Sequence, residues 1–199
     1  MTSPDLAVVY DEHMPKELFL EFKNSIDEKN LSVVVEVKED NGPYACPEWF
    51  MLTAVAIFIG KSYFDGFLKE AGKDHYQKLK SHLTRLTNEV MSKPKIEPIL
   101  VGTEGKISSN NPYSLSFSIY AEANDGNRFK LLLPKPYDTE DYTYIIHGFL
   151  EFLNDYHSGI KVLEDIGFDD NVRAPSGIIF AHMNQESKQI EWLDQREYR

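Results

Sequence analysis

The stretch that most constrains the fold is a run of twelve consecutive uncharged residues, WFMLTAVAIFIG at 49–60. A membrane-spanning helix needs about 20 mostly apolar residues, whereas a run of about 10–14 is more typical of a buried core helix or an interfacial segment. Phe64 and Phe67 continue the apolar pattern at helical spacing until Gly72. We therefore predict a central helix from about Pro47 to Ala71, ended by the glycine.

A β-α-β unit is predicted before this run. The segments Leu6–Tyr10 and Leu31–Val37 are rich in β-branched residues, and apolar residues between them recur at helical spacing after Pro15. A crossover of this length makes parallel pairing of the two strands plausible. A linker rich in turn-forming residues follows at 39–47.

A second helix is predicted after the central one. Asp74 can cap it, and its apolar residues alternate steps of three and four along a narrow seam: Tyr76, Leu79, Leu83, Leu86 and Val90. The seam is too short for a free-standing coiled coil, so we expect this helix to pack against the central helix as a helical hairpin. Pro94 follows the segment and favours its end there.

The second half of the chain is predicted to be rich in β-structure. Three strands, at 96–102, 113–123 and 128–133, indicate an antiparallel meander, with Asn124–Asn127 as the turn between the last two. A further helix is expected between Asp138 and Gly159, and a terminal hairpin from 178–183 and 189–193. The sequence thus predicts the α+β class and a single compact domain over 1–199, with a subdivision near residue 95 as the alternative.

Charge and cysteine content limit the classes of function. The chain has 21 basic and 32 acidic side chains, a net charge of −11, with concentrations of acid in 1–60 and 138–170 and of base in 61–95. Such a balance disfavours direct nucleic-acid binding, and it suits an acidic surface that attracts a basic protein partner. The single cysteine excludes an internal disulfide, and no signal peptide is evident, so we expect a cytoplasmic, soluble protein.

No catalytic, cofactor or metal motif emerges from the residues. The segment Gly102–Ser108 lacks the spacing of a phosphate-binding loop, and no nucleophile elbow exists in the chain. Cys46 precedes the predicted central helix, where a thiolate would be favoured, but the sequence identifies no partner base. The six histidines form neither a CxxC-type nor an HExxH-type metal pattern. We therefore predict no cofactor and no metal ion.

The predicted interaction site lies at the corner where the 39–47 linker meets the central helix. Its aromatic residues are Tyr44, Trp49, Phe50 and Tyr63. We expect a non-catalytic protein-interaction or accessory module, with an immunity or regulatory role allowed, that binds a protein partner, basic in charge, through this corner. Two alternatives remain open: a small hydrolase or transferase that uses Cys46 or a histidine, and a peripheral membrane protein that binds through 49–68. The oligomeric state is left open.

Overall fold

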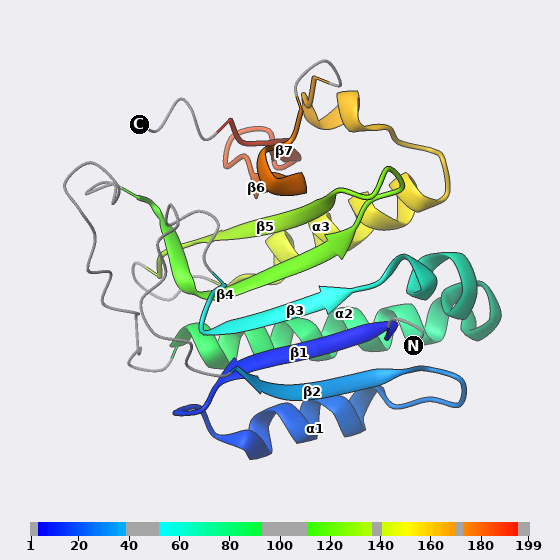
Figure 1. Ribbon diagram of the computed structural model, residues 1–199, viewed down its shortest axis with the longest axis vertical. Helices are drawn as coiled ribbons and strands as arrows, with labels where there is room; N and C mark the ends of the chain where they lie inside the picture. Colours follow the sequence, from blue (N-terminus) through cyan, green and yellow to red (C-terminus); the bar gives the residue numbers. More distant parts are fainter. Residues whose placement is uncertain (1–3, 39–51, 93–110, 137–140, 170–172, 195–199) are drawn as a thin grey trace.

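The computed structural model describes residues 4–38, 52–92, 111–136, 141–169 and 173–194 (Figure 1). Within these residues the chain forms one seven-stranded mixed sheet with the strand order β2-β1-β3-β4-β5-β6-β7. The strands are β1 (Leu6–Asp11), β2 (Val33–Lys38), β3 (Val55–Ile59), β4 (Tyr113–Glu122), β5 (Arg128–Pro134), β6 (Ile178–Met183) and β7 (Ile190–Trp192). The helices are α1 (Lys16–Ile26), α2 (Leu68–Ser92) and α3 (Thr143–His157). The predicted α+β class is confirmed.

Three pairs of parallel strands are each joined by one of the helices. The N-terminal β1-α1-β2 unit was predicted, and Leu6 does pair with Val33 in parallel register. The pairs β3-β4 and β5-β6 are also parallel, and α2 and α3 connect them. Neighbouring units meet through antiparallel contacts, β1 with β3 and β4 with β5. Strands from both sides of residue 95 therefore belong to the same sheet.

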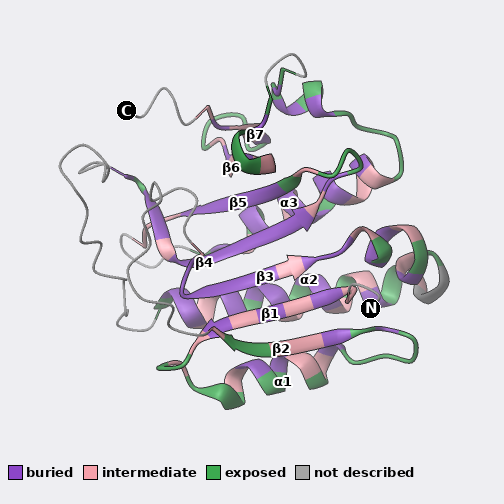
Figure 2. Ribbon diagram, in the orientation of Figure 1, coloured by how far each residue is buried: buried purple, intermediate pink, exposed green. Residues whose placement is uncertain are grey.

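All three long helices cover the same face of the sheet (Figure 1). Successive side chains of a strand point to opposite faces, so alternate residues of each strand meet the helices. These residues form the main core together with the apolar faces of the helices (Figure 2). A smaller apolar cluster lies on the other face and contains Tyr113, Leu132, Phe180 and Leu193. The face away from the helices is the one on which the candidate site lies.

The predicted central helix at 47–71 is wrong over 55–59. Val55–Ile59 is strand β3, which lies inside the sheet between β1 and β4. Four of its five residues are buried and only Phe58 is partly exposed. Both sides of this strand carry apolar residues, including Ala56 and Phe58 on the face without helices, so the run lacks the alternation of a half-buried strand and resembles a buried helix. Residues 47–51 of the predicted helix lie outside the described residues.

Helical structure begins at Lys61, after the strand. A π-helical segment, η2 (Tyr63–Phe67), leads into α2, which is interrupted at Gly72 by a φ of +75°. The predicted end of a helix at Gly72 is therefore confirmed, because the non-helical backbone there separates the helical residues on either side. The predicted seam residues Leu79, Leu83 and Val90 are buried. Within the described residues α2 packs against α1, α3 and the η2 segment that precedes it, rather than against one long central helix.

The predicted turns of the second half are confirmed. Strands β4 and β5 pair antiparallel around Asn124–Asn127, and β6 and β7 form the terminal hairpin. Helix α3 ends at His157, and Gly159 follows with a φ of +73°. The first meander strand, predicted at 96–102, lies outside the described residues. Among the helices described, none combines the length and the apolar character that crossing a membrane requires.

Candidate functional site

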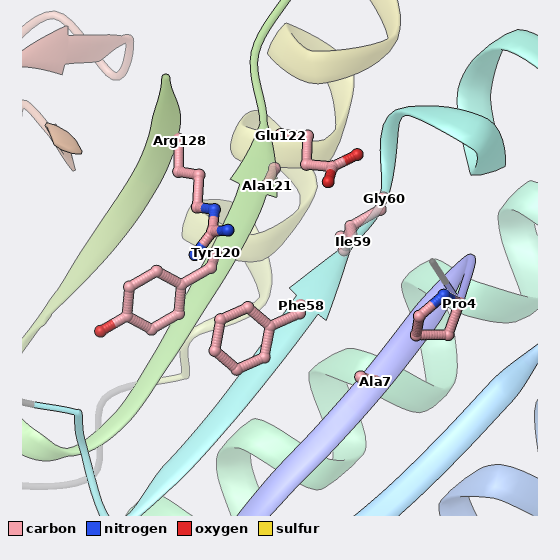
Figure 3. Close-up of a pocket in the computed structure, with 9 residues that line it drawn as sticks. All are labelled: Pro4, Ala7, Phe58, Ile59, Gly60, Tyr120, Ala121, Glu122 and Arg128. Atoms are coloured by element: carbon pink, nitrogen blue, oxygen red, sulfur yellow. The ribbon is translucent and has the colours of Figure 1, made fainter. Parts of the chain in front are cut away.

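A depression opens on the sheet face that the helices leave uncovered (Figure 3). It lies where the parallel strands β3 and β4 end, and β1 and the start of β5 flank it. Its volume is about 180 Å³. The residues that line it are Pro4, Ala7, Phe58, Ile59, Gly60, Tyr120, Ala121, Glu122 and Arg128. Strand register brings these residues together, because Phe58 pairs with Ala7 on one side and with Tyr120 on the other.

The base of the depression is aromatic. The rings of Phe58 and Tyr120 stack with their centroids 4.8 Å apart and their planes at 14° (Figure 3). On the far side of Tyr120, the buried Lys130 amine lies 5.4 Å from the centre of its ring. Burial raises the pKa of Tyr120 to about 12, so its hydroxyl stays protonated at neutral pH and is no nucleophile. The partly exposed ring of Phe58 is the main apolar surface offered to a ligand.

Two opposite charges border the aromatic base. Glu122 and Arg128 are paired residues of the β4-β5 hairpin, and the Arg128 side chain is exposed. The Glu122 carboxylate accepts a hydrogen bond of 2.8 Å from the backbone N–H of Lys61, at the start of the helical segment. A carboxylate in this place satisfies one of the unpaired N–H groups of the helix end and opposes its positive dipole.

A second carboxylate occupies the same helix start. Asp5 Oδ1 accepts a hydrogen bond from the Ser62 hydroxyl at 2.5 Å, and its backbone oxygen accepts one from the Gly60 N–H at 2.8 Å. A strand followed by Gly-Lys-Ser and a helix would otherwise suit an anion such as phosphate. With Asp5 and Glu122 already in position, a phosphate group would meet two negative charges. The depression is therefore better suited to an apolar group with polar neighbours than to an anion.

The predicted interaction residues are only partly placed by the structure. Tyr44, Trp49 and Phe50 lie outside the described residues. Tyr63 is buried, with 0% of its surface exposed, and its hydroxyl lies 3.2 Å from Nδ1 of His75. Its ring belongs to the core under η2, so in this conformation Tyr63 has no surface to offer a partner.

The described histidines and carboxylates do not assemble a catalytic centre around the depression. In the described parts of the chain, no group of three or more histidine, cysteine or acidic side chains is arranged to hold a metal ion. Asp11 accepts a 2.8 Å hydrogen bond from Nδ1 of His13, which is the orientation seen in catalytic dyads. That pair is exposed, and its residues are two positions apart in one turn. Cys46 lies outside the described residues.

Sequence reasoning missed the residues of the depression. The predicted helix at 47–71 contains Phe58, and the predicted strands at 113–123 and 128–133 contain Glu122 and Arg128 without marking either as a site residue. The Asn124–Asn127 turn was recognised, and it alone places Glu122 opposite Arg128.

Comparison of the chain with protein-family models, with curated proteins and with solved structures yields no match.

Proposed function

We propose that this chain is a protein-interaction module, and that the depression at the ends of β3 and β4 receives an apolar side chain of a protein partner. The observation that carries the proposal is the partly exposed Phe58 ring, stacked on Tyr120, in a depression that the oppositely charged Glu122 and Arg128 also line. Aromatic and arginine side chains in a small pocket are the residue types that dominate binding energy at protein interfaces.

The size of the depression supports a side chain rather than a cofactor or a metabolite. Small-molecule sites typically enclose about 300–1,000 Å³, and this depression offers about 180 Å³. A single leucine or aromatic side chain would fill much of that space. Arg128 and Glu122 would then bind the backbone or polar groups on either side of the inserted side chain, and the net charge of −11 favours a partner that is basic overall.

Quantitative capture tests the proposal. The tagged protein is incubated with native lysate of its source, and bound proteins are compared by mass spectrometry between wild type, Phe58→Ala and Arg128→Ala. Arg85→Ala is the control for the arginine, because Arg85 is an exposed residue of α2, which covers the opposite face of the sheet. Tyr144→Ala is the control for the aromatic residue, because 38% of Tyr144 is exposed on α3.

We expect a partner that binds wild type and both controls but is reduced about tenfold by either depression variant. The affinity is then measured with the purified partner, after thermal melting has shown that each variant is folded. Trp49→Ala is tested alongside, since the corner around Trp49 was the site predicted from sequence. A partner retained equally by Phe58→Ala and Arg128→Ala, or no partner above background at low salt, would refute the proposal.

A further inference from the structure

The outer edge of strand β2 is open. β2 is the first strand of the sheet, and within the described residues no strand pairs with its outer side. On its inner side, the Leu6 N–H donates to the Ser32 carbonyl at 3.1 Å and opens the parallel pairing with β1. The backbone groups of successive residues alternate between the two sides of such a strand, so those of Val33, Val35 and Val37 point away from β1. A further β-strand would pair with these outward N–H and C=O groups.

β2 has few of the features that keep a sheet edge from pairing, which are short length, charge, proline and bulges. The strand at the opposite edge, β7, has three residues, whereas β2 has six, and four of them are valines. The register of β2 with β1 is regular from end to end, and Glu36 is the only exposed charged residue of the strand. Val37 is 48% exposed. The edge therefore offers apolar surface together with hydrogen-bonding groups.

Helix α1 adds a second exposed apolar residue at the same edge. Phe19 and Phe22 of α1 lie in the core, and Glu21 pairs with Arg85 of α2 at 2.9 Å. Successive helical residues are about 100° apart, so Leu20 projects to the side of α1 that faces away from α2. That side is the outer one, because α1 lies with β2 at the bottom of the molecule in Figure 1 and α2 lies further in. Leu20 is 38% exposed.

A second copy of the chain fits this edge through a two-fold axis perpendicular to the sheet. Antiparallel pairing of two β2 strands about such an axis places both α1 helices on the same face, side by side. With Val35 opposite Val35 of the second copy, Val33 faces Val37, and all three outward-pointing residues of each strand have partners. Glu36 then faces Val34. A register shifted by two residues would instead place Glu36 opposite Glu36, where the two negative charges repel.

The local charge and the two apolar residues favour a second copy over other occupants. The chain as a whole carries a net charge of −11, which opposes self-association. Residues 16–38, which contain α1 and β2, have four basic and five acidic side chains, so most of the acidic excess lies elsewhere. An unrelated extended peptide would cover β2 alone. A second copy covers Leu20 as well, because it brings its own α1 to the same face.

We propose that the chain forms a two-fold symmetric dimer through β2, in which the two seven-stranded sheets join into one continuous sheet and the two α1 helices pack through Leu20. This surface is separate from the depression at the ends of β3 and β4 and does not depend on the function proposed for it. The backbone hydrogen bonds set the alignment of the two strands, and Val37 and Leu20 supply the apolar contact area.

Sedimentation equilibrium of the purified full chain tests the dimer. Val37→Lys places a charge in the apolar contact, and Val35→Pro removes an outward N–H that β1 does not use. The matched control is Val162→Lys, which introduces the same charge at a side chain that is 52% exposed. Val162 precedes η3 (Leu163–Ile166), which contacts β7 at the opposite edge of the sheet. Circular dichroism and thermal melting verify the fold of each variant.

Wild type and Val162→Lys should be dimers at micromolar concentrations, and both edge variants should raise the dissociation constant of the dimer about tenfold or more. Leu20→Ser should raise it by a smaller factor. A wild-type chain that stays monomeric up to about 100 µM would overturn the inference. Edge variants that dimerise as tightly as Val162→Lys would overturn it too.

A cysteine on the two-fold axis tests the alignment without a charged or proline substitution in the edge. In a Cys46→Ser background, Val35→Cys should form an intermolecular disulfide on mild oxidation, because the two residues 35 face each other with their Cα atoms about 5.5 Å apart. Val162→Cys in the same background is the control and should remain reduced. Absence of the Val35→Cys disulfide, or equal cross-linking of the two variants, would contradict the proposed dimer.

Discussion

The imidazole of His75 joins three elements in the core, and its replacement gives a quantitative test of the fold. His75 is 4% exposed. Its Nε2–H donates to the Ile26 carbonyl at 2.9 Å, and its Nδ1 accepts a hydrogen bond from the Tyr63 hydroxyl at 3.2 Å. The Ile26 carbonyl belongs to the last turn of α1, where no intrahelical donor is available. Burial raises the pKa of Tyr63, so its hydroxyl remains a donor at neutral pH.

His75→Leu keeps a side chain of similar bulk but orphans two buried groups, the Ile26 carbonyl and the Tyr63 hydroxyl. Each buried group left without a partner costs about 1–3 kcal/mol, so we expect a loss of roughly 2–5 kcal/mol in the free energy of unfolding. Tyr63→Phe orphans only Nδ1 of His75 and should cost about 1 kcal/mol. In the double variant the hydroxyl is gone, so its loss should be smaller than the sum of the two single losses.

Urea unfolding followed by circular dichroism measures the free energy of unfolding of all three variants. An unchanged m value, the slope of that free energy against urea concentration, verifies that the substitutions do not alter the denatured state. The corresponding fall in melting temperature is roughly 2–4 °C per kcal/mol for a chain of this size. A loss below about 1 kcal/mol for His75→Leu, or additivity of the two substitutions, would show that these hydrogen bonds are not formed in solution.

Three further predictions follow from other contacts. Gly60→Ala should destabilise the fold by about 1–3 kcal/mol in the same urea assay, because its new Cβ would lie 2.9 Å from the Pro4 carbonyl oxygen. An unchanged free energy of unfolding would mean that residue 60 and the Pro4 carbonyl are not in such close contact. Burial lowers the pKa of His157 below its usual 6.5, as it does for three other histidines. The unfolded state therefore binds more protons than the folded state as the pH falls. The free energy of unfolding should accordingly decrease when the pH is lowered from 7.5 to 5.5. His157→Phe should reduce that fall, and an unchanged pH dependence would exclude this residue as a source. Glu151→Met should destabilise more than Lys80→Met, because it leaves the buried Lys80 amine without the carboxylate that lies 2.7 Å from it, and equal thermal melts would contradict this.

The sequence indicated correctly the elements whose apolar residues repeat with one clear period. Leu6–Tyr10, the α1 face around Phe19 and Phe22, and the hairpin around Asn124–Asn127 all show one buried side and one polar side or a strong turn. Val55–Ile59 shows neither, because apolar residues occupy both sides of this strand, including the side on which Phe58 lines the depression. The same error lengthened the predicted central helix, whose helical part begins only at Lys61, and so made a long helix the expected packing partner of α2.

The candidate site was beyond sequence reasoning for a different reason. Ala7, Phe58 and Tyr120 are far apart in the chain and become neighbours only through the pairing of β1, β3 and β4. That pairing depends on the order of strands in the sheet, which no local spacing encodes.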